Sequence, residues 1–420
     1  MIKNFFIKNF RSIKDRLDIS FETSLLGDET FYENTFKKGE LSLSKVLAFY
    51  GMNASGKSTI AIAFSVLREL VIPLVNGPVL PYYPFTFSKE TKNEPTEVGA
   101  EFSLDNNGDS FVYRYFVKFD GKRVISEKFE KLTSQKYSLI YQRETDESFS
   151  TKVTIGNNAP NAPLLQALVD SIVPDRTFLS MFGRFKVPDL YDAYMFFLER
   201  FHNSSFAVNR FVDYNPINIA NNPDLKRFTL SLLKAADFNI KDIYVDKVKI
   251  PNYVNNQPLF VAEKDSLFLQ HEGEVDDCTL EFSNESLGTK KIVLLAEALY
   301  LVFLKSSVMI IDELEASLHP ELTKLIVTCF LDETININNS QLIFTSHETT
   351  LLDLNLLRRD QIMFVYKDAH SCSTYLRTLK DFHVRKTDSV AKSYLAGRYM
   401  TSPEINQNLL GGFKDENKTD

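Results

Sequence analysis

A short stretch in the first part of the chain has the residue types and spacing to hold a polyphosphate. Residues 51–58 read GMNASGKS, which fits the pattern G-x-x-x-x-G-K-S. An apolar run suited to a buried strand, VLAFY at 46–50, precedes the pattern, and a run with helical spacing follows it at 58–71. A glycine turn before an ordinary helix is the alternative. The strand–loop–helix context is, however, the one in which this pattern binds phosphate.

Each residue type in this loop has a physical role. Gly51 and Gly56 let backbone amides point inward around the phosphates, and the N-terminus of the following helix adds partial positive charge. Lys57 would reach the terminal phosphates, and Ser58 would offer a hydroxyl to Mg²⁺. The pattern therefore predicts a nucleotide site with a magnesium ion.

Two further stretches would complete a hydrolytic site. VMIIDE at 308–313 is an apolar strand that runs into two carboxylates, at the end of a sheet where ligands of open α/β folds bind. Asp312 would hold Mg²⁺ through water, and Glu313 would orient and deprotonate the attacking water. A strand that simply ends in an acidic turn is the alternative. QLIFTSHE at 341–348 is a second apolar strand, and its His347 would sense the γ-phosphate unless it is incidental.

Composition narrows the class of protein. The 420 residues are 44% hydrophobic and 25% charged, which is ordinary for globular proteins, and the length suggests about two or three domains. The net charge of −7 argues against a generally basic nucleic-acid surface, although a local basic groove stays open. Three widely spaced cysteines without a CxxC pair indicate a reduced, cytoplasmic protein without disulfides or structural zinc. The apolar windows are too short to span a membrane.

The segments between the motifs differ in character. Residues 77–157 have turn signals between β-rich runs, which predicts an antiparallel sheet. Residues 163–236 have helical periodicity without sustained heptads, which predicts a compact helical insertion rather than a long coiled coil. The aromatic-rich part of this segment, YDAYMFFLERFHNSSFAVNRF, is typical of core packing, with a docking surface for a partner as the alternative. Residues 237–283 are rich in strand-forming residues.

The order GMNASGKS, NESLGTKKIVLLAEAL, VMIIDELEASLHP and QLIFTSHETTLLD resembles the ABC-type ATPase heads of SMC and RecF proteins. More closely, it resembles the AAA15-type ATPases of bacterial phage-defence operons, such as RloA/AbiL-type proteins and AriA of the PARIS system. The resemblance is strong over residues 1–60 and 280–400 and weak between them. It implies an α/β fold, namely a P-loop NTPase of the ABC-ATPase head type with an antiparallel β subdomain and a compact helical insertion.

On this resemblance the chain divides into four parts. Residues 1–160 would form ATPase lobe I, with the Walker A loop and the antiparallel β subdomain, and residues 161–240 the helical insertion. Residues 241–400 would form ATPase lobe II, with a signature-like segment, the Walker B pair, the D-loop and the switch histidine. Residues 401–420 would be a flexible tail.

The family's site roles map onto individual positions. Asp312 and Glu313 match the Walker B pair, with Asp312 at the metal and Glu313 as the catalytic base, and His347 matches the switch histidine. Ser286 and Gly288 stand in the place of the signature motif, which in ABC-type heads caps the γ-phosphate bound by the opposite subunit, although SLGTK departs from the usual SGGQ. The Walker A residues expected to bind ATP are Gly51, Asn53, Ala54, Ser55, Gly56, Lys57, Ser58 and Thr59.

Three assignments are less direct. Arg11, in the opening NFRSI, is expected either to approach the nucleotide or to have a purely structural role. Residues 315–319 (EASLH) would be the D-loop at the dimer interface. The stretch YYPFTFSKE falls where a Q-loop would lie but contains no glutamine, so ATP turnover is expected to be slow or partner-dependent.

The resemblance implies an ATP-gated switch in anti-phage defence. Two or more copies would close around ATP and Mg²⁺ and control a separately encoded effector, a nuclease or toxin, with a TOPRIM-type nuclease expected. The alternative is a RecF- or SMC-like DNA-binding ATPase of DNA repair, with nucleic acid as the partner. A third hypothesis, that the chain itself cuts nucleic acid, is disfavoured: the residues after about 350 are too few for a fused TOPRIM domain, and Arg377 and His383, spaced like a ribonuclease motif, lie in a strand-like run.

Overall fold

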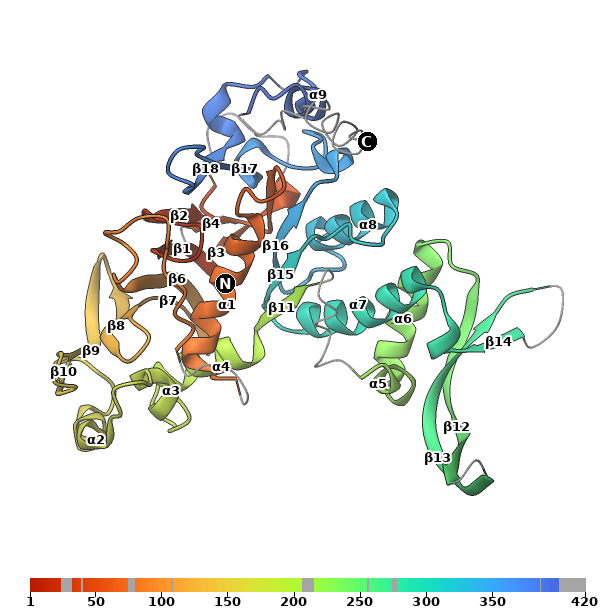
Figure 1. The fold of residues 1–420 in the computed structure, drawn as a ribbon, viewed down its shortest axis with the longest axis horizontal. Coiled ribbons are helices and arrows are strands. Elements are labelled where there is room, and N and C mark those ends of the chain that lie inside the picture. Colours follow the sequence, from red (N-terminus) through yellow and green to blue (C-terminus); the bar gives the residue numbers. More distant parts are fainter. Residues whose placement is uncertain are drawn as a thin grey trace, which may run out of the picture.

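The computed structural model describes residues 1–23, 32–38, 41–74, 80–106, 109–205, 215–254, 257–273, 278–385 and 387–399. Two large sheets, the helices between and beside them, and a long β ribbon that projects to one side make up this part of the chain (Figure 1). The tail expected at 401–420 lies outside the described residues.

A six-stranded sheet forms the centre of the fold, in the order β11-β15-β16-β5-β17-β18. Neighbouring strands are parallel except for the β17–β18 pair. The four inner strands, β15, β16, β5 and β17, are largely apolar runs because both faces of the sheet are covered there. Their bounds are β5 Val46–Gly51, β11 Phe201–Ser205, β15 Val308–Asp312, β16 Gln341–Ser346, β17 Ile362–Lys367 and β18 Thr374–Thr378.

Alternate residues of the central strands face two different cores. Leu47 and Phe49 of β5 face one core together with helix α1, whereas Ala48 and Tyr50 face the other core together with helices α7 and α8. This period of two is what a strand buried on both sides requires. The helices are α1 Lys57–Val71, α7 Leu287–Leu304 and α8 Pro320–Leu331.

The antiparallel sheet expected over 77–157 is present and also includes the two N-terminal strands. Its order is β10-β9-β8-β7-β6-β1-β2, and it covers the face of α1 that points away from the central sheet. Phe5 of β1 stacks on Phe64 of α1, with ring centroids 3.9 Å apart. The strands are β1 Ile2–Lys8, β2 Leu17–Ser20, β6 Thr96–Asn106, β7 Asp109–Phe119, β8 Val124–Thr133, β9 Lys136–Thr145 and β10 Thr151–Ile155.

The segment expected to be a helical insertion is helical but is divided between two places. Helices α3 and α4 pack on α1, whereas α5 and α6 pack beside α7 and the β ribbon. Between them, strand β11 joins the central sheet beside β15, a pairing that the polar sequence FHNSS does not signal. Helix α4 buries Tyr194, Phe196 and Phe197, so these three aromatic residues are core residues, whereas residues 206–211 of the aromatic-rich run lie outside the described residues. The helices are α2 Ala162–Leu168, α3 Phe178–Phe182, α4 Leu190–Glu199, α5 Ile217–Asn221 and α6 Pro223–Ala235.

The strand-rich stretch that follows forms a long antiparallel ribbon. Strands β12 and β13 pair along their length, and β14 pairs only with the end of β13 that lies near the body (Figure 1). None of the described helices is long and apolar enough to cross a membrane. The remaining elements are β3 Thr35–Lys38, β4 Leu41–Ser44, β12 Ile240–Val254, β13 Gln257–His271, β14 Cys278–Glu281 and α9 Val390–Leu395.

Candidate functional site

The loop between β5 and α1 has the geometry of a phosphate-binding loop. Gly56 is the N-cap of α1 with a φ of 112°, and no side chain caps the first turn of this helix, so its N-terminal amides are left for a ligand. A Cβ atom at Gly51 would lie 2.2 Å from the carbonyl oxygen of Val365, and one at Gly56 would lie 2.2 Å from Oγ1 of Thr374. Both positions therefore require glycine.

Lys57 is a buried cation in this loop. Its side chain amine donates to the carbonyl oxygens of Gly51 at 2.8 Å and Met52 at 2.9 Å. Burial lowers the pKa of Lys57 to about 8, although Asp312, Glu315 and Glu313 act in the opposite direction. An ammonium group with so little water around it gains from any anion placed beside it, which suits a triphosphate. Elsewhere in the loop Asn53, Ala54 and Ser58 are exposed, Ser55 is buried and Thr59 is half-buried.

The two carboxylates after β15 are fixed by one threonine of the next strand. The hydroxyl of Thr345 donates to Oδ1 of Asp312 at 2.6 Å, and it accepts the backbone N–H of Glu313 at 2.8 Å. Glu313 has a φ of 54°, a left-handed conformation that costs a non-glycine residue about 1–3 kcal/mol and that clusters at functional sites. Sequence reasoning gave Thr345 no role. Its only signal is a hydroxyl directly after the apolar run at 342–344.

His347 follows β16 and lies beside the same carboxylates. Its backbone N–H donates to Oε1 of Glu315 at 2.6 Å, and the other oxygen of Glu315 is buried without a hydrogen-bond partner in the described part of the chain. Burial and the charge of Lys57 lower the pKa of the His347 imidazole, although Glu315 and Asp312 oppose this. The imidazole is therefore neutral at neutral pH. A neutral ring still carries one N–H, which can donate a hydrogen bond to a phosphate oxygen.

These side chains gather because β5, β16 and β15 are adjacent parallel strands. Their carboxyl ends lie at one edge of the sheet, where Tyr50 pairs with Ser346 and Phe344 with Ile311. The loops that follow these strands place Lys57, Asp312, Glu313 and His347 close enough to influence one another's charge. The structure thus brings the loop at 51–58 close to the ends of the strands at 308–313 and 341–348.

The donors at this edge fit a magnesium ion. Ser58 offers an exposed hydroxyl and Asp312 a partly exposed carboxylate, whose Oδ1 is already bonded to Thr345. Mg²⁺ commonly takes one or two protein oxygens and fills its other positions with phosphate and water. Among the described residues, no three His, Cys, Asp or Glu side chains form a metal-binding cluster.

The signature-like segment opens α7. Ser286 is the N-cap, and its Oγ accepts the backbone N–H of Thr289 at 3.1 Å. Leu287 is 70% exposed, and a Cβ atom at Gly288 would have no neighbour closer than 3.8 Å. One turn further, Lys291 donates to the carbonyl of Ala316 in the expected D-loop. This helix start therefore combines an open surface with contact to the Walker B side of the site.

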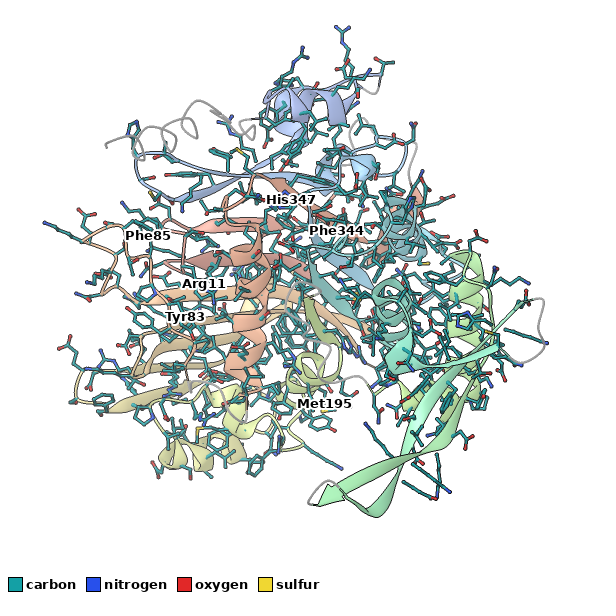
Figure 2. All side chains as sticks on the ribbon, turned by 45° about the vertical axis from the view of Figure 1, so that its right-hand side comes forward. Arg11, Tyr83, Phe85, Met195, Phe344 and His347 are labelled. Atoms are coloured by element: carbon teal, nitrogen blue, oxygen red, sulfur yellow. The ribbon has the colours of Figure 1, made fainter. Side chains whose placement is uncertain are left out.

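Arg11 lies in the turn after β1 and points toward aromatic rings. Its guanidinium is 5.7 Å from the ring centroid of Phe10 and 5.3 Å from that of Tyr83, and Figure 2 shows Arg11 beside Tyr83 and apart from His347. The neighbouring Ser12 is the residue that contacts the Walker A loop, with its hydroxyl 3.2 Å from Oγ1 of Thr59. In the turn after β1 it is therefore Ser12, rather than Arg11, that forms a hydrogen bond with the Walker A loop.

Residues 46–353 match the family described as AAA domain, putative AbiEii toxin, Type IV TA system. The chain belongs to this family. Its fold is that of an α/β P-loop ATPase with mixed sheets and several helices. The family match contains both Walker motifs, the signature-like segment and His347.

Solved structures give a more distant likeness to this AAA-family chain. An SMC head bound to the C-winged helix domain of ScpA is 15% identical, with a TM-score of 0.41 and coverage of 91% of this chain and 99% of that chain. The SMC head from Thermotoga maritima is 14% identical, with a TM-score of 0.38 and coverage of 90% and 98%. CbiO1 of the ABC transporter complex CbiONQ, from Clostridium perfringens, is 11% identical, with a TM-score of 0.35 and coverage of 96% and 98%. No curated protein matches the sequence.

Proposed function

We propose that this protein binds ATP with Mg²⁺, hydrolyses it, and uses the nucleotide to control its own assembly. The observation that carries this proposal is the gathering of Lys57, Asp312, Glu313 and His347 at one sheet edge, beside the uncapped N-terminus of α1. Cation, metal-binding carboxylate, base and phosphate sensor are the parts that phosphoryl transfer to water needs.

In the hydrolytic step, water attacks the γ-phosphorus and the bond from that phosphorus to the β–γ bridging oxygen breaks. Glu313 takes a proton from the water, and the Thr345 hydroxyl holds both the Glu313 backbone and Asp312 in place for this. Lys57 leaves the carbonyls of Gly51 and Met52 to face the phosphate oxygens. Ser58 and Asp312 would hold Mg²⁺, which neutralises charge on the phosphates.

A second copy of the chain would complete the site. The exposed Leu287 and the open position at Gly288 give the start of α7 a surface that another phosphate-bearing molecule can approach. In the proposed assembly, this segment of one subunit faces the γ-phosphate bound by its twin, and the D-loop after Asp312 lies between them. An isologous pair of this kind contains two equivalent ATP sites.

Mixing two inactive variants tests this arrangement. Lys57→Ala removes the phosphate cation, and Gly288→Asp places a carboxylate where the structure has room for it but where the twin's γ-phosphate would be repelled. Each variant alone should lose ATPase activity. The mixture should recover about a quarter of wild-type activity, because half of the pairs are mixed and each mixed pair has one intact site.

Two results would contradict the shared site. Gly288→Asp would retain full activity if each chain hydrolysed ATP alone, and the mixture would stay inactive if the two segments acted within one chain. Gly288→Ala is the matched control and should retain activity, since a methyl group there would lie 3.8 Å from its nearest neighbour, an ordinary van der Waals distance.

We further propose that the switch acts in anti-phage defence, as an AAA15-type ATPase that controls a separately encoded nuclease or toxin in the cytoplasm. The family description, with its AbiEii toxin, supports a defence role. Co-purification of the tagged protein with a product of a neighbouring gene, dependent on ATP, is the expected result. Tight DNA binding with DNA-stimulated ATPase activity and no associated protein would instead indicate a RecF-like repair function.

A further inference from the structure

The Walker A loop accepts a hydrogen bond from Thr374, a threonine of the hairpin formed by β17 and β18. Oγ1 of Thr374 lies 2.9 Å from the carbonyl oxygen of Ser55 and 2.8 Å from the hydroxyl of Ser12. Ser12 in turn lies 3.2 Å from Oγ1 of Thr59. Because a carbonyl only accepts, the Thr374 hydroxyl donates to Ser55, and the hydroxyls of Ser12 and Thr59 continue the chain of hydrogen bonds.

The position of Thr374 follows from the sheet. Strand β17 pairs with β5 so that Val365 lies opposite Gly51, and β18 turns back along β17. Thr374, the first residue of β18, thereby reaches the loop that follows β5. The backbone N–H of Thr374 also donates to the carbonyl of Ser12 at 2.7 Å, which joins the hairpin to the N-terminal turn. Ser12 and Thr374 both lie outside the residues that match the family.

Thr374 is packed directly against Gly56 of the loop. It is 4% exposed, and its Oγ1 and Cγ2 occupy the space that a Cβ atom of Gly56 would need. Gly56 has the positive φ that aims the first amides of α1 at the ligand. The hydroxyl of Thr374 therefore fixes the residue before Gly56, and its methyl group fixes Gly56 itself.

We propose that Thr374 is a positioning residue for ATP, which holds the Walker A loop in its phosphate-binding shape before the nucleotide arrives. The inference rests on the proposed ATP site. A loop that is already ordered does not have to be ordered by the ligand, so the contact contributes to affinity. In the described part of the chain the Thr374 hydroxyl bonds to Ser55 and Ser12 and not to Glu313, the proposed base, so the rate of the chemical step should not depend on it.

Thr374→Val tests this because valine keeps the shape and removes the donor. The buried carbonyl of Ser55 loses its partner, at a cost of about 1–2 kcal/mol, which corresponds to a 5- to 30-fold weaker affinity for ATP. We expect Kd and KM for ATP to rise by this factor while kcat stays within about twofold of wild type. Thr374→Ser keeps the donor and should bind ATP nearly as wild type does.

A matched control separates positioning from stability. Thr229→Val removes another buried threonine hydroxyl, which donates to the carbonyl of Leu225 in α6, away from the loop. This variant should leave Kd and KM unchanged. If Thr374→Val does not fold, Ser12→Ala provides a second test. It removes the hydroxyl that is hydrogen-bonded to Thr374 and should raise the Kd for ATP by a smaller factor.

The outcomes distinguish this inference from the function it rests on. Wild-type protein that fails to bind ATP overturns the proposed function itself. Wild-type binding together with an unchanged Kd in Thr374→Val overturns only the positioning role, as does a fall in kcat at constant KM. Equal losses in Thr374→Val and Thr374→Ser would also overturn it, because they would show that shape rather than the hydroxyl matters.

Discussion

The affinity for ATP should fall as the pH rises above about 8, because Lys57 is a buried lysine. Its side chain has only the carbonyls of Gly51 and Met52 as hydrogen-bond partners in the described chain, and it is 6% exposed. Burial therefore brings the pKa of Lys57 down to about 8. A bound triphosphate favours the charged amine, so the proton stays on Lys57 in the complex.

The size of the effect follows from this difference. Below pH 8 both the free and the ATP-bound protein hold the proton on Lys57, so the protonation of Lys57 does not change the affinity for ATP. Above pH 8 binding must take up a proton, so affinity falls about tenfold per pH unit, and Kd should rise about tenfold from pH 7 to pH 9. His347, whose pKa is lowered, stays neutral.

Loss of folding does not explain such a fall. The folded-state pKa of Lys57 lies below its ordinary value, so the unfolded chain binds more protons between about pH 8 and pH 10.5. Over that window this group makes the free energy of unfolding larger as pH rises. Its contribution to stability and its contribution to ATP affinity therefore change in opposite directions.

Titration with a fluorescent ATP analogue at pH 7, 8 and 9, at constant ionic strength and free Mg²⁺, measures the effect. Lys57→Arg is the matched control, because arginine keeps its charge over this range. Its affinity should be weaker but independent of pH. A wild-type Kd that does not change between pH 7 and pH 9 would refute the reasoning.

Three further predictions follow from single contacts. Thr345→Val should lower kcat about tenfold or more with little change in Kd, in steady-state ATPase assays, because Glu313 loses the acceptor of its backbone N–H. Gly56→Ala should abolish ATP binding in the same fluorescence titration while the chain stays folded, because its φ of 112° and the neighbouring side chain leave no room for a methyl group. Arg143→Met should lower the free energy of unfolding, measured in urea, by about 3–5 kcal/mol, because it leaves the buried carboxylate of Glu127 without its cation.

The parts of the site that can be predicted from the sequence are those formed by residues that are consecutive in the chain. A strand, a glycine-rich loop and a helix follow one another around Lys57, and an apolar run ends directly at Asp312 and Glu313. Parallel strands bring such ends together whatever lies between them in the chain. Local patterns of this kind are sufficient to find the Walker motifs.

The parts that sequence reasoning missed depend on contacts between distant small polar residues. Thr345 reaches Asp312 across a strand pair, and Thr374 reaches Ser55 from the far end of the chain. A single hydroxyl in a strand leaves no periodicity and no motif. Strand β11 was missed for a related reason. It is a polar strand at the edge of the six-stranded sheet, and it forms by pairing with β15 rather than through an apolar pattern of its own.

The mass of the Glu313→Gln variant in solution, with and without Mg²⁺ and ATP, tests the central claim most directly. Glutamine keeps the size of the side chain but cannot take a proton, so the variant should bind ATP, fail to hydrolyse it, and double the mass of its nucleotide-free form, with Lys57→Ala unchanged by ATP. Hydrolysis by Glu313→Gln at the wild-type rate, or an unchanged mass when ATP saturates the variant, would contradict the account.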